Sequence, residues 1–159
     1  MIAMRTWFLL ALAAGSLACA EPAAGSWQDI SWFDDAAGYA QAVAKAEAEG
    51  KPVFVYFYTE WCPYCRQLNA ELLAAAEVQE EIDRMIAVRV NAEGGPDERS
   101  LAAHYRVRGY PALFVFTANA RSGYPGGDFQ PIRRTVGGAE GVRLKTPAEF
   151  VATLRAAGR

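Results

Sequence analysis

Residues 53–65 have the sequence VFVYFYTEWCPYC, a run of β-branched and aromatic side chains that ends in two cysteines. Six such residues in a row, placed directly after Pro52, are typical of a strand buried on both faces at the centre of a sheet. Pro63 suits the first turn of a helix, because its missing N–H leaves no hydrogen bond unmade there. The stretch therefore predicts a central strand, a tight loop and a helix that begins at the cysteines.

The spacing of Cys62 and Cys65 points to thiol chemistry rather than structural cross-linking. Structural disulfides usually join distant segments, because closing a long loop restricts the unfolded chain most. Cys62 should lie at the helix N-terminus, where unpaired amides and the helix dipole stabilise a thiolate. Cys65 lies one turn further on, within disulfide reach and better covered. We expect Cys62 to attack a target disulfide and Cys65 to resolve the mixed disulfide. Trp61 can shield the pair, and Tyr64 is expected to be exposed and to touch substrate.

The same spacing also begins many zinc modules, so a structural zinc site is the competing interpretation. Such a site needs about four ligands. Beyond the pair, the chain offers His104 and loosely placed carboxylates, and the remaining cysteine, Cys19, lies near the N-terminus. We therefore predict no metal site and no cofactor other than the redox-active disulfide between Cys62 and Cys65.

The rest of the sequence predicts helices and strands that alternate around the central strand. The order is β-α-β-α-β-β-α behind an N-terminal helix, which indicates an α/β fold. The glycine- and proline-rich stretch 119–131 is expected to be a surface loop. The expected elements are a helix from Asp34 or Asp35 to Glu49, a helix from Arg66 to about Ile82, a strand over 86–91, a helix over 97–105, a strand over 112–117, an edge strand over 132–136, and a final helix opened by a capping box at 146–149.

Gly109-Tyr110-Pro111 interrupts this pattern just before a strand. Proline cannot donate a hydrogen bond to a sheet, and a Tyr-Pro bond can be cis. A cis bond would let Tyr110 offer free backbone groups beside Cys62, where a substrate segment could add as a short strand. Tyr110 and Pro111 are therefore candidate substrate-binding residues, together with Trp61 and Tyr64.

Taken together, Trp61–Cys65 after the strand, Gly109–Pro111 and Val136-Gly137-Gly138 resemble the thioredoxin superfamily. The resemblance covers about residues 51–158. The stretch from Trp32 to Lys51 is similar to bacterial exported thioredoxin-like proteins and to the C-terminal domain of the membrane electron-transfer disulfide reductase. The resemblance implies a thioredoxin fold, with a central mixed β-sheet flanked by helices on both faces and an extra N-terminal helix. It also implies a cis Pro111, Cys62 as nucleophile and Cys65 as resolving residue.

One departure from the family concerns proton transfer. Thioredoxins carry a buried aspartate in the strand before the cysteines, and this chain has Tyr56 there. Glu60 is the candidate substitute for proton transfer, although its negative charge would oppose ionisation of Cys62. The alternative interpretation is that Glu60 is simply a solvated surface carboxylate.

The first twenty residues are typical of an export signal. Arg5 is followed by a short apolar stretch, and Ala18-Cys19-Ala20 fits a cleavage site. The alternative is a lipobox over 16–19, with Cys19 lipidated. The apolar stretch is too short for an ordinary membrane-spanning helix. We expect a signal peptide over 1–20, a linker and N-terminal approach over 21–33, and a thioredoxin-like domain over 34–159.

Charge and motifs together narrow the function. The net charge of −2 becomes −3 when Arg5 leaves with the signal, with 15 basic against 18 acidic side chains, which argues against nucleic acid as a partner. We expect a periplasmic or otherwise exported enzyme that reduces disulfides in exported proteins with electrons from a membrane thiol donor. Contact with a membrane is expected only through lipid at Cys19. A disulfide oxidase or isomerase stays open, because direction follows reduction potential, and a Cu(I) metallochaperone is the alternative of another class.

Overall fold

The computed structural model describes residues 25–117, 129–139 and 141–159. The predicted signal peptide, and with it the choice between cleavage and lipidation at Cys19, lies outside these residues, as does most of the predicted loop over 119–131. Among the described residues, no helix combines the length and the apolarity that crossing a bilayer requires.

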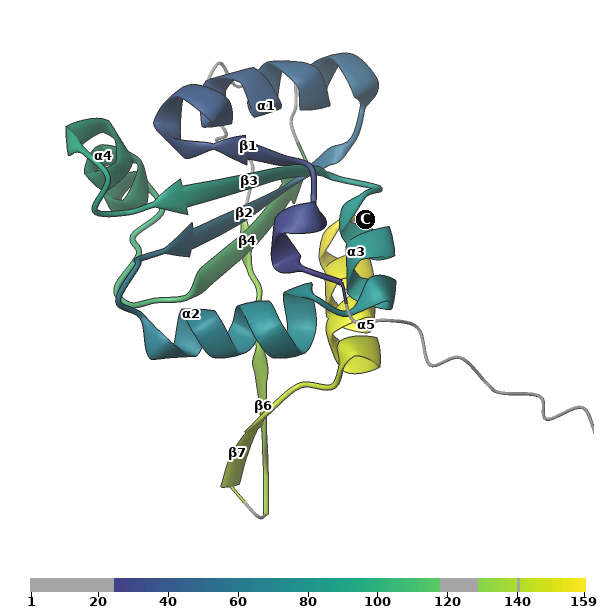
Figure 1. Cartoon of the computed structure of the whole chain (residues 1–159). Helices are drawn as coiled ribbons and strands as arrows, with labels where there is room; N and C mark the ends of the chain where they lie inside the picture. Colours follow the sequence, from purple (N-terminus) through teal and green to yellow (C-terminus); the bar gives the residue numbers. More distant parts are fainter. Residues whose placement is uncertain (1–24, 118–128, 140) are drawn as a thin grey trace, which may run out of the picture.

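A five-stranded sheet with strand order β1-β3-β2-β4-β5 forms the centre of the molecule (Figure 1). β2 (Pro52–Tyr58) lies in the middle, parallel to β3 (Ile86–Asn91) and antiparallel to β4 (Ala112–Thr117). β1 (Trp32–Asp34) pairs parallel with β3 at one edge, and β5 (Gln130–Pro131) pairs antiparallel with β4 at the other. Five successive residues of β2, Val53 to Phe57, are fully buried, which confirms the predicted central strand.

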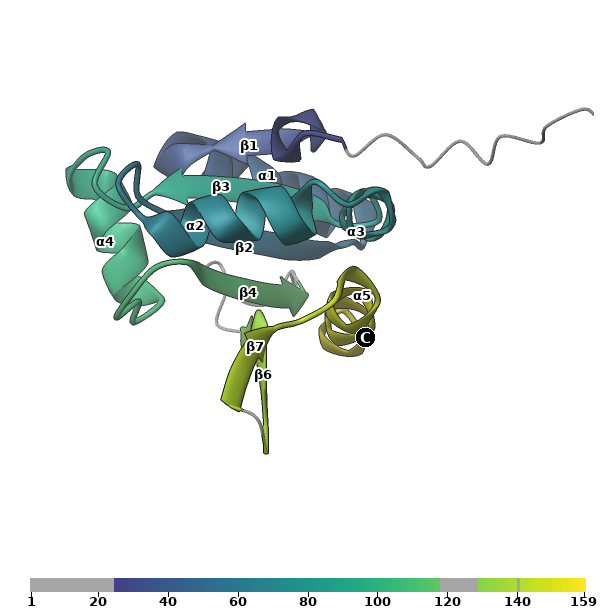
Figure 2. The ribbon, with the colours of Figure 1, turned by 60° about the horizontal axis from the view of Figure 1, so that its bottom comes forward.

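Helices cover both faces of this sheet (Figures 1 and 2). α2 (Pro63–Leu68), α3 (Ala76–Ile82) and α5 (Pro147–Ala157) pack on one face, which holds the core around Phe54, Tyr56 and Leu154. α1 (Asp35–Glu49) and α4 (Pro96–His104) contribute to the core of the other face, around Val55 and Phe57. The expected mixed α/β fold with helices on both faces is confirmed, and the expected N-terminal helix is present as α1, although β1 precedes it.

The long helix expected from Arg66 to Ile82 is wrong. α2 passes into a π-helical segment, η2 (Asn69–Leu73), which ends before α3 begins. In a continuous α-helix, Leu73 would point about 140° away from Leu68, at 100° per residue. The wider π-helical segment rotates less per residue, so Leu72 and Leu73 are both fully buried. The irregular segment thus lets both leucines face the same core cluster as Leu68.

The expected antiparallel edge strand is present next to β4, but it is β5, Gln130–Pro131, and not residues 132–136. The Ile132 amide donates to the Leu113 carbonyl at 2.8 Å, but the chain then leaves the sheet. It forms a separate hairpin of β6 (Thr135–Gly138) and β7 (Gly141–Leu144), which protrudes from the body (Figures 1 and 2). Gly141 adopts φ +107 at the start of β7, a conformation that favours glycine.

Residues just before the first long helix pack against the sheet. A short 3-10 helix, η1 (Trp27–Asp29), is closed by a capping box at Ser26, and Trp27 contacts the rings of Trp32 and Tyr58. β1 spans the domain boundary predicted at residue 34, which stays a prediction. At the other end, the predicted capping box of α5 is present, with Thr146 and Glu149 bonded reciprocally.

Candidate active site

The end of β2 and the start of α2 hold the two cysteines together. Cys62 is the N-cap of α2 and Pro63 is its first residue, as the sequence predicts. Cys62 and Cys65 are joined by a disulfide, with their Cα atoms 5.2 Å apart. The Cys65 amide donates to Cys62 Sγ at 3.1 Å, so an N-terminal N–H of the helix points at the sulfur of the predicted nucleophile.

Burial does not distinguish the two cysteines. Both are 2% exposed, so the expectation that Cys65 is better covered is wrong for the disulfide form. The bond ties Cys62 to its partner inside the apolar cluster of this face, and Tyr110 packs against the same cluster. What separates the two sulfurs is therefore position, because Cys62 lies at the helix terminus and Cys65 within the first turn.

Two exposed aromatic side chains are close to the disulfide in sequence, Trp61 just before Cys62 and Tyr64 between the two cysteines. Trp61 is 62% exposed and Tyr64 is 58% exposed. Trp61 Nε1 donates to Glu93 Oε2 at 2.9 Å, and Arg66 Nη1 donates to the Trp61 carbonyl at 3.2 Å. The Arg134 guanidinium lies over the Tyr64 ring, 5.0 Å from its centroid. Both aromatic side chains are therefore held by polar neighbours while more than half of each residue stays exposed.

The loop before β4 reaches the same site. The Tyr110–Pro111 peptide bond is cis. The Tyr110 ring meets Trp61 edge to face, with ring centroids 6.5 Å apart, and it contacts the cores of both sheet faces. Burial, and then the negative charge of Glu93, raise the pKa of Tyr110. The structure thus brings Tyr110 into contact with Trp61, while the substrate-binding role of Trp61, Tyr64, Tyr110 and Pro111 stays a prediction.

Tyr56 stands in the strand beneath α2 with its side chain fully buried. Its hydroxyl donates to Asn69 Oδ1 at 2.9 Å. Burial raises the pKa of Tyr56 far above that of an exposed tyrosine, so the ring stays neutral in the physiological range. Sequence analysis missed Asn69, although a polar residue between Leu68 and Leu72 on the same helical run was a usable signal.

Glu60 is exposed, in the turn between β2 and α2. Its charge adds to the burial that raises the pKa of Tyr56 and of Tyr58. A role for Glu60 in proton transfer stays a prediction. Sequence analysis also missed Thr59, which is 2% exposed and whose carbonyl accepts from the Cys62 amide at 3.2 Å.

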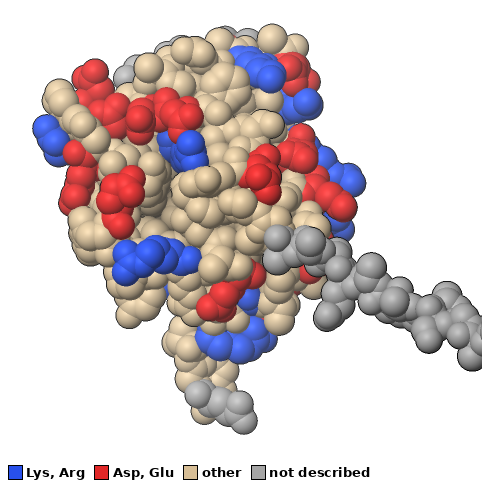
Figure 3. All heavy atoms as spheres, viewed as in Figure 1, with Lys and Arg blue, Asp and Glu red and all other residues tan. Residues whose placement is uncertain are grey.

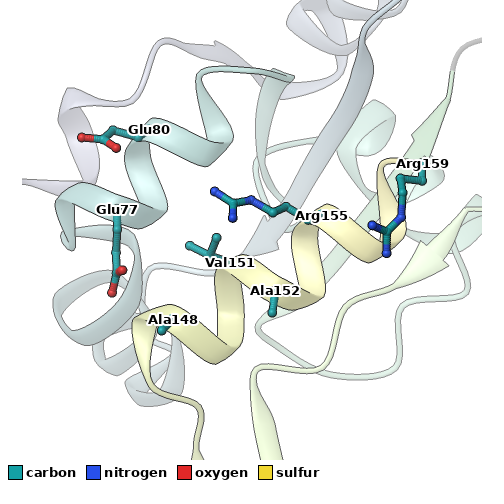
Figure 4. A pocket seen from close by; sticks show the side chains of 7 residues that line it. All are labelled: Glu77, Glu80, Ala148, Val151, Ala152, Arg155 and Arg159. Carbon is teal, nitrogen blue, oxygen red and sulfur yellow. The ribbon is translucent and has the colours of Figure 1, made fainter.

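A concave region lies between α3 and α5, away from the start of α2 (Figures 1 and 4). Its walls combine acidic side chains of α3 with Arg155 and Arg159 at the end of the chain. On the face seen in Figure 3, basic and acidic side chains are interspersed. Within the described ranges, no three His, Cys, Asp or Glu side chains are grouped so as to hold a metal ion.

Residues 39–130 match the thioredoxin-like domain family. The chain belongs to this family. The thioredoxin-like chain is 28% identical over 130 residues to thiol:disulfide interchange protein DsbD 1 of Pseudomonas aeruginosa, a match that covers 81% of this chain and 20% of that relative. It is 37% identical over 75 residues to protein disulfide isomerase-like 1-4 of Arabidopsis thaliana, covering 47% of this chain and 12% of that relative. The chain thus spans about a fifth or less of the length of these two relatives.

Among solved structures, a thioredoxin from Thermus thermophilus is similar, with a TM-score of 0.58 and 29% identity over 80% of this chain and 85% of the other. With the family established, the arrangement at the start of α2 is that of a thiol–disulfide oxidoreductase. The paired sulfurs can store two electrons as dithiol and release them as disulfide.

Proposed function

We propose that this chain is an exported thiol–disulfide oxidoreductase that reduces protein disulfides, with Cys62 as the attacking and Cys65 as the resolving residue. The observation that carries the proposal is the Cys62–Cys65 disulfide at the N-terminus of α2, with the Cys65 amide directed at Cys62 Sγ. The similarity to a thiol:disulfide interchange protein over most of the chain supports the same chemistry. Export rests on the predicted signal over residues 1–20.

The reaction runs through two exchanges. The Cys62 thiolate attacks one sulfur of the target disulfide, a mixed disulfide forms, and one target thiolate leaves. Cys65 then gives up its proton to solvent and attacks Cys62 Sγ, the second target thiolate leaves, and the Cys62–Cys65 disulfide forms. Two electrons have passed to the target. A dithiol donor, which we place in the membrane, must reduce the pair again.

The surroundings of Cys62 support reduction as the working direction. Strongly oxidising members of this class stabilise the nucleophile's thiolate heavily, which makes the dithiol form favourable. Here the two residues between the cysteines are uncharged, and the preceding turn carries the acidic Glu60. A less stabilised thiolate leaves the disulfide form favourable, so the dithiol form gives up its electrons readily.

Target binding is proposed to use the exposed rims of Trp61 and Tyr64 and the backbone at Tyr110 and Pro111. An extended segment with its disulfide over Cys62 would lie between these side chains, with Tyr110 offering backbone hydrogen bonds as a neighbouring strand does. The Arg134 guanidinium, stacked on Tyr64, would border one end of that segment.

The test combines a measurement of the reduction potential with the trapping of mixed disulfides. The reduction potential of the mature chain against glutathione should lie near that of thioredoxin, about −270 mV, rather than near about −120 mV. Cys65→Ser should accumulate mixed disulfides with exported proteins, and Cys62→Ser, the matched control, should not. A potential at the oxidising end would contradict the proposed reductase and favour an oxidase or isomerase. The similarity to a protein disulfide isomerase-like protein makes this the alternative to test. Stoichiometric Cu(I) binding with no trapped partner would favour a metallochaperone.

A further inference from the structure

The hydroxyl of Thr59, three residues before Cys62, is buried without a hydrogen-bond partner among the described residues. The side chain is 2% exposed and follows directly on the buried central strand. A buried hydroxyl left without a partner disfavours the state in which it occurs, because it has lost its bonds to water. Such a group calls for a specific explanation.

Backbone bonds place Thr59 next to the nucleophile. The Cys62 amide donates to the Thr59 carbonyl at 3.2 Å, so the two residues are the first and last of one tight turn. Such a turn brings its end residues within about 7 Å, Cα to Cα. Cys62 and Cys65 are also 2% exposed, so the hydroxyl and both sulfurs lie where water is largely excluded.

Three polar side chains around the pair already donate hydrogen bonds to other groups. The Tyr56 hydroxyl donates to Asn69, the Trp61 indole donates to Glu93, and Arg66 donates to the Trp61 carbonyl. The sulfur of a disulfide is a weak acceptor, whereas a thiolate is a charged one and binds donors more strongly. Opening the disulfide therefore creates a strong acceptor in the same turn as the unused donor.

We propose that Thr59 is a redox-dependent positioning residue, whose hydroxyl donates to the Cys62 thiolate only when the disulfide is open. The hydroxyl then disfavours the oxidised form, in which it has no partner, and favours the reduced form, in which it has one. Thr59 raises the reduction potential of the pair and makes the Cys62 thiolate easier to form. The inference rests on the thiol–disulfide exchange proposed above. It holds whether the chain reduces or oxidises its targets, and it does not depend on which protein is the target.

The step balances with a dithiol as reductant. The S–S bond between Cys62 and Cys65 breaks, and a disulfide forms in the dithiol, which supplies two electrons and two protons. Cys65 takes one proton, Cys62 stays a thiolate, and the second proton goes to solvent. The Thr59 hydroxyl keeps its own proton and directs it at Cys62 Sγ.

Each segment around the cysteine pair contributes other charged or ionisable groups. These are Glu60 in the turn, Arg66 on α2, Tyr56 and Tyr58 on β2, Glu93 after β3, and Tyr110 before β4. All of them stay the same in a Thr59 variant, so a difference between variants is assigned to the hydroxyl.

Thr59→Val keeps the shape and removes the hydroxyl, and Thr59→Ser keeps the hydroxyl. For each protein, equilibrium with dithiothreitol gives the potential, and iodoacetamide alkylation of the reduced form gives a pH profile. Thr59→Val should make the pair about tenfold harder to reduce, which is about 30 mV more negative. Its alkylation midpoint should rise by about one pH unit, and Thr59→Ser should restore both values.

A third measurement separates this role from a merely structural one. Thr59→Val should raise the urea midpoint of the oxidised form and lower that of the reduced form. Equal shifts of the urea midpoint in both forms, with an unchanged reduction potential, would overturn the proposal. A water molecule bound to the hydroxyl in both forms would give this result. Failure of the wild-type pair to exchange with dithiothreitol at all would instead overturn the proposed function.

Discussion

Tyr56 shows how a single side chain changes the proton chemistry beneath the cysteines. A buried carboxylate at this position could take up a proton, but a phenol whose pKa is raised by burial stays protonated. Its hydroxyl is committed to Asn69 at 2.9 Å. We therefore expect the proton of Cys65 to leave to solvent rather than to an internal base.

Replacing Tyr56 with Phe tests this view. The variant should lose about 1 kcal/mol of unfolding free energy, because one hydrogen bond is removed. The pH profile of disulfide reduction between about pH 6 and 9 should stay in place, since the tyrosine does not ionise there. Reduction of a model disulfide, followed across pH, measures it. A profile displaced by a unit or more would make Tyr56 a participant in proton transfer.

A substitution of Arg134 tests how the protein binds its disulfide substrate. Arg134→Ala frees the Tyr64 ring from its stacked guanidinium, and Arg133→Ala is the matched control at the exposed position beside it. With a protein disulfide as substrate, Arg134→Ala should raise KM about threefold, and with dithiothreitol both variants should behave as wild type. Equal effects of the two variants on KM would contradict a role for Arg134 in binding.

At the scale of elements, α5 is held at its start by side chains from β7. Arg143 makes a two-pronged ion pair with Glu149, which also accepts from the Thr146 amide. These bonds lower the pKa of Glu149 to about 2. The hairpin that leaves the main sheet is thereby tied to the last helix.

This ion pair predicts an acid-dependent stability. The folded-state pKa of Glu149 lies below its unfolded value, so the stabilisation is present above about pH 4.5 and is lost as the pH falls through 2. Glu149→Gln should therefore flatten the fall of the urea midpoint between about pH 5 and 2. Arg143→Met should flatten it similarly by removing the partner. A slope unchanged in both variants would contradict the assignment.

At the scale of the whole molecule, α3 and α5 are joined by a buried carboxylate. Glu81 has a side chain only 7% exposed, and Arg155 Nε donates to its Oε2 at 2.8 Å. Arg155 extends from α5 toward α3 (Figure 4). Arg84, from the loop after α3, lies 3.9 Å from the same oxygen.

Removing one partner should cost more than removing both. Arg155→Met leaves the Glu81 carboxylate poorly paired, and it should lower the unfolding free energy by about 1–3 kcal/mol. Adding Glu81→Met in the same chain should recover much of that loss. A double-mutant cycle in urea measures the coupling, and strictly additive effects would show that the pair does not join the helices.

Features that depend on neighbouring residues could be predicted from the amino-acid sequence. Val53 to Tyr58, Pro63 and the capping box at Thr146 correctly predicted β2, the start of α2 and the start of α5, because strand burial, a missing N–H and a cap act within a few residues. The pairing of Cys62 with Cys65 could be predicted because the two residues are about one helical turn apart. Tyr110-Pro111 was found next to Trp61, as the motifs together indicated.

Features that depend on residues distant in sequence could not be predicted, because they form only when separate segments pack together. The π-helical segment at Leu72 and Leu73 arises because both must face the same sheet, and the β6–β7 hairpin arises because Thr135 pairs with Leu144 rather than with β4. Burial of Cys62 and isolation of the Thr59 hydroxyl likewise depend on what packs over the turn. Local sequence sets backbone preference, but burial and hydrogen-bond partners are settled only when separate segments meet.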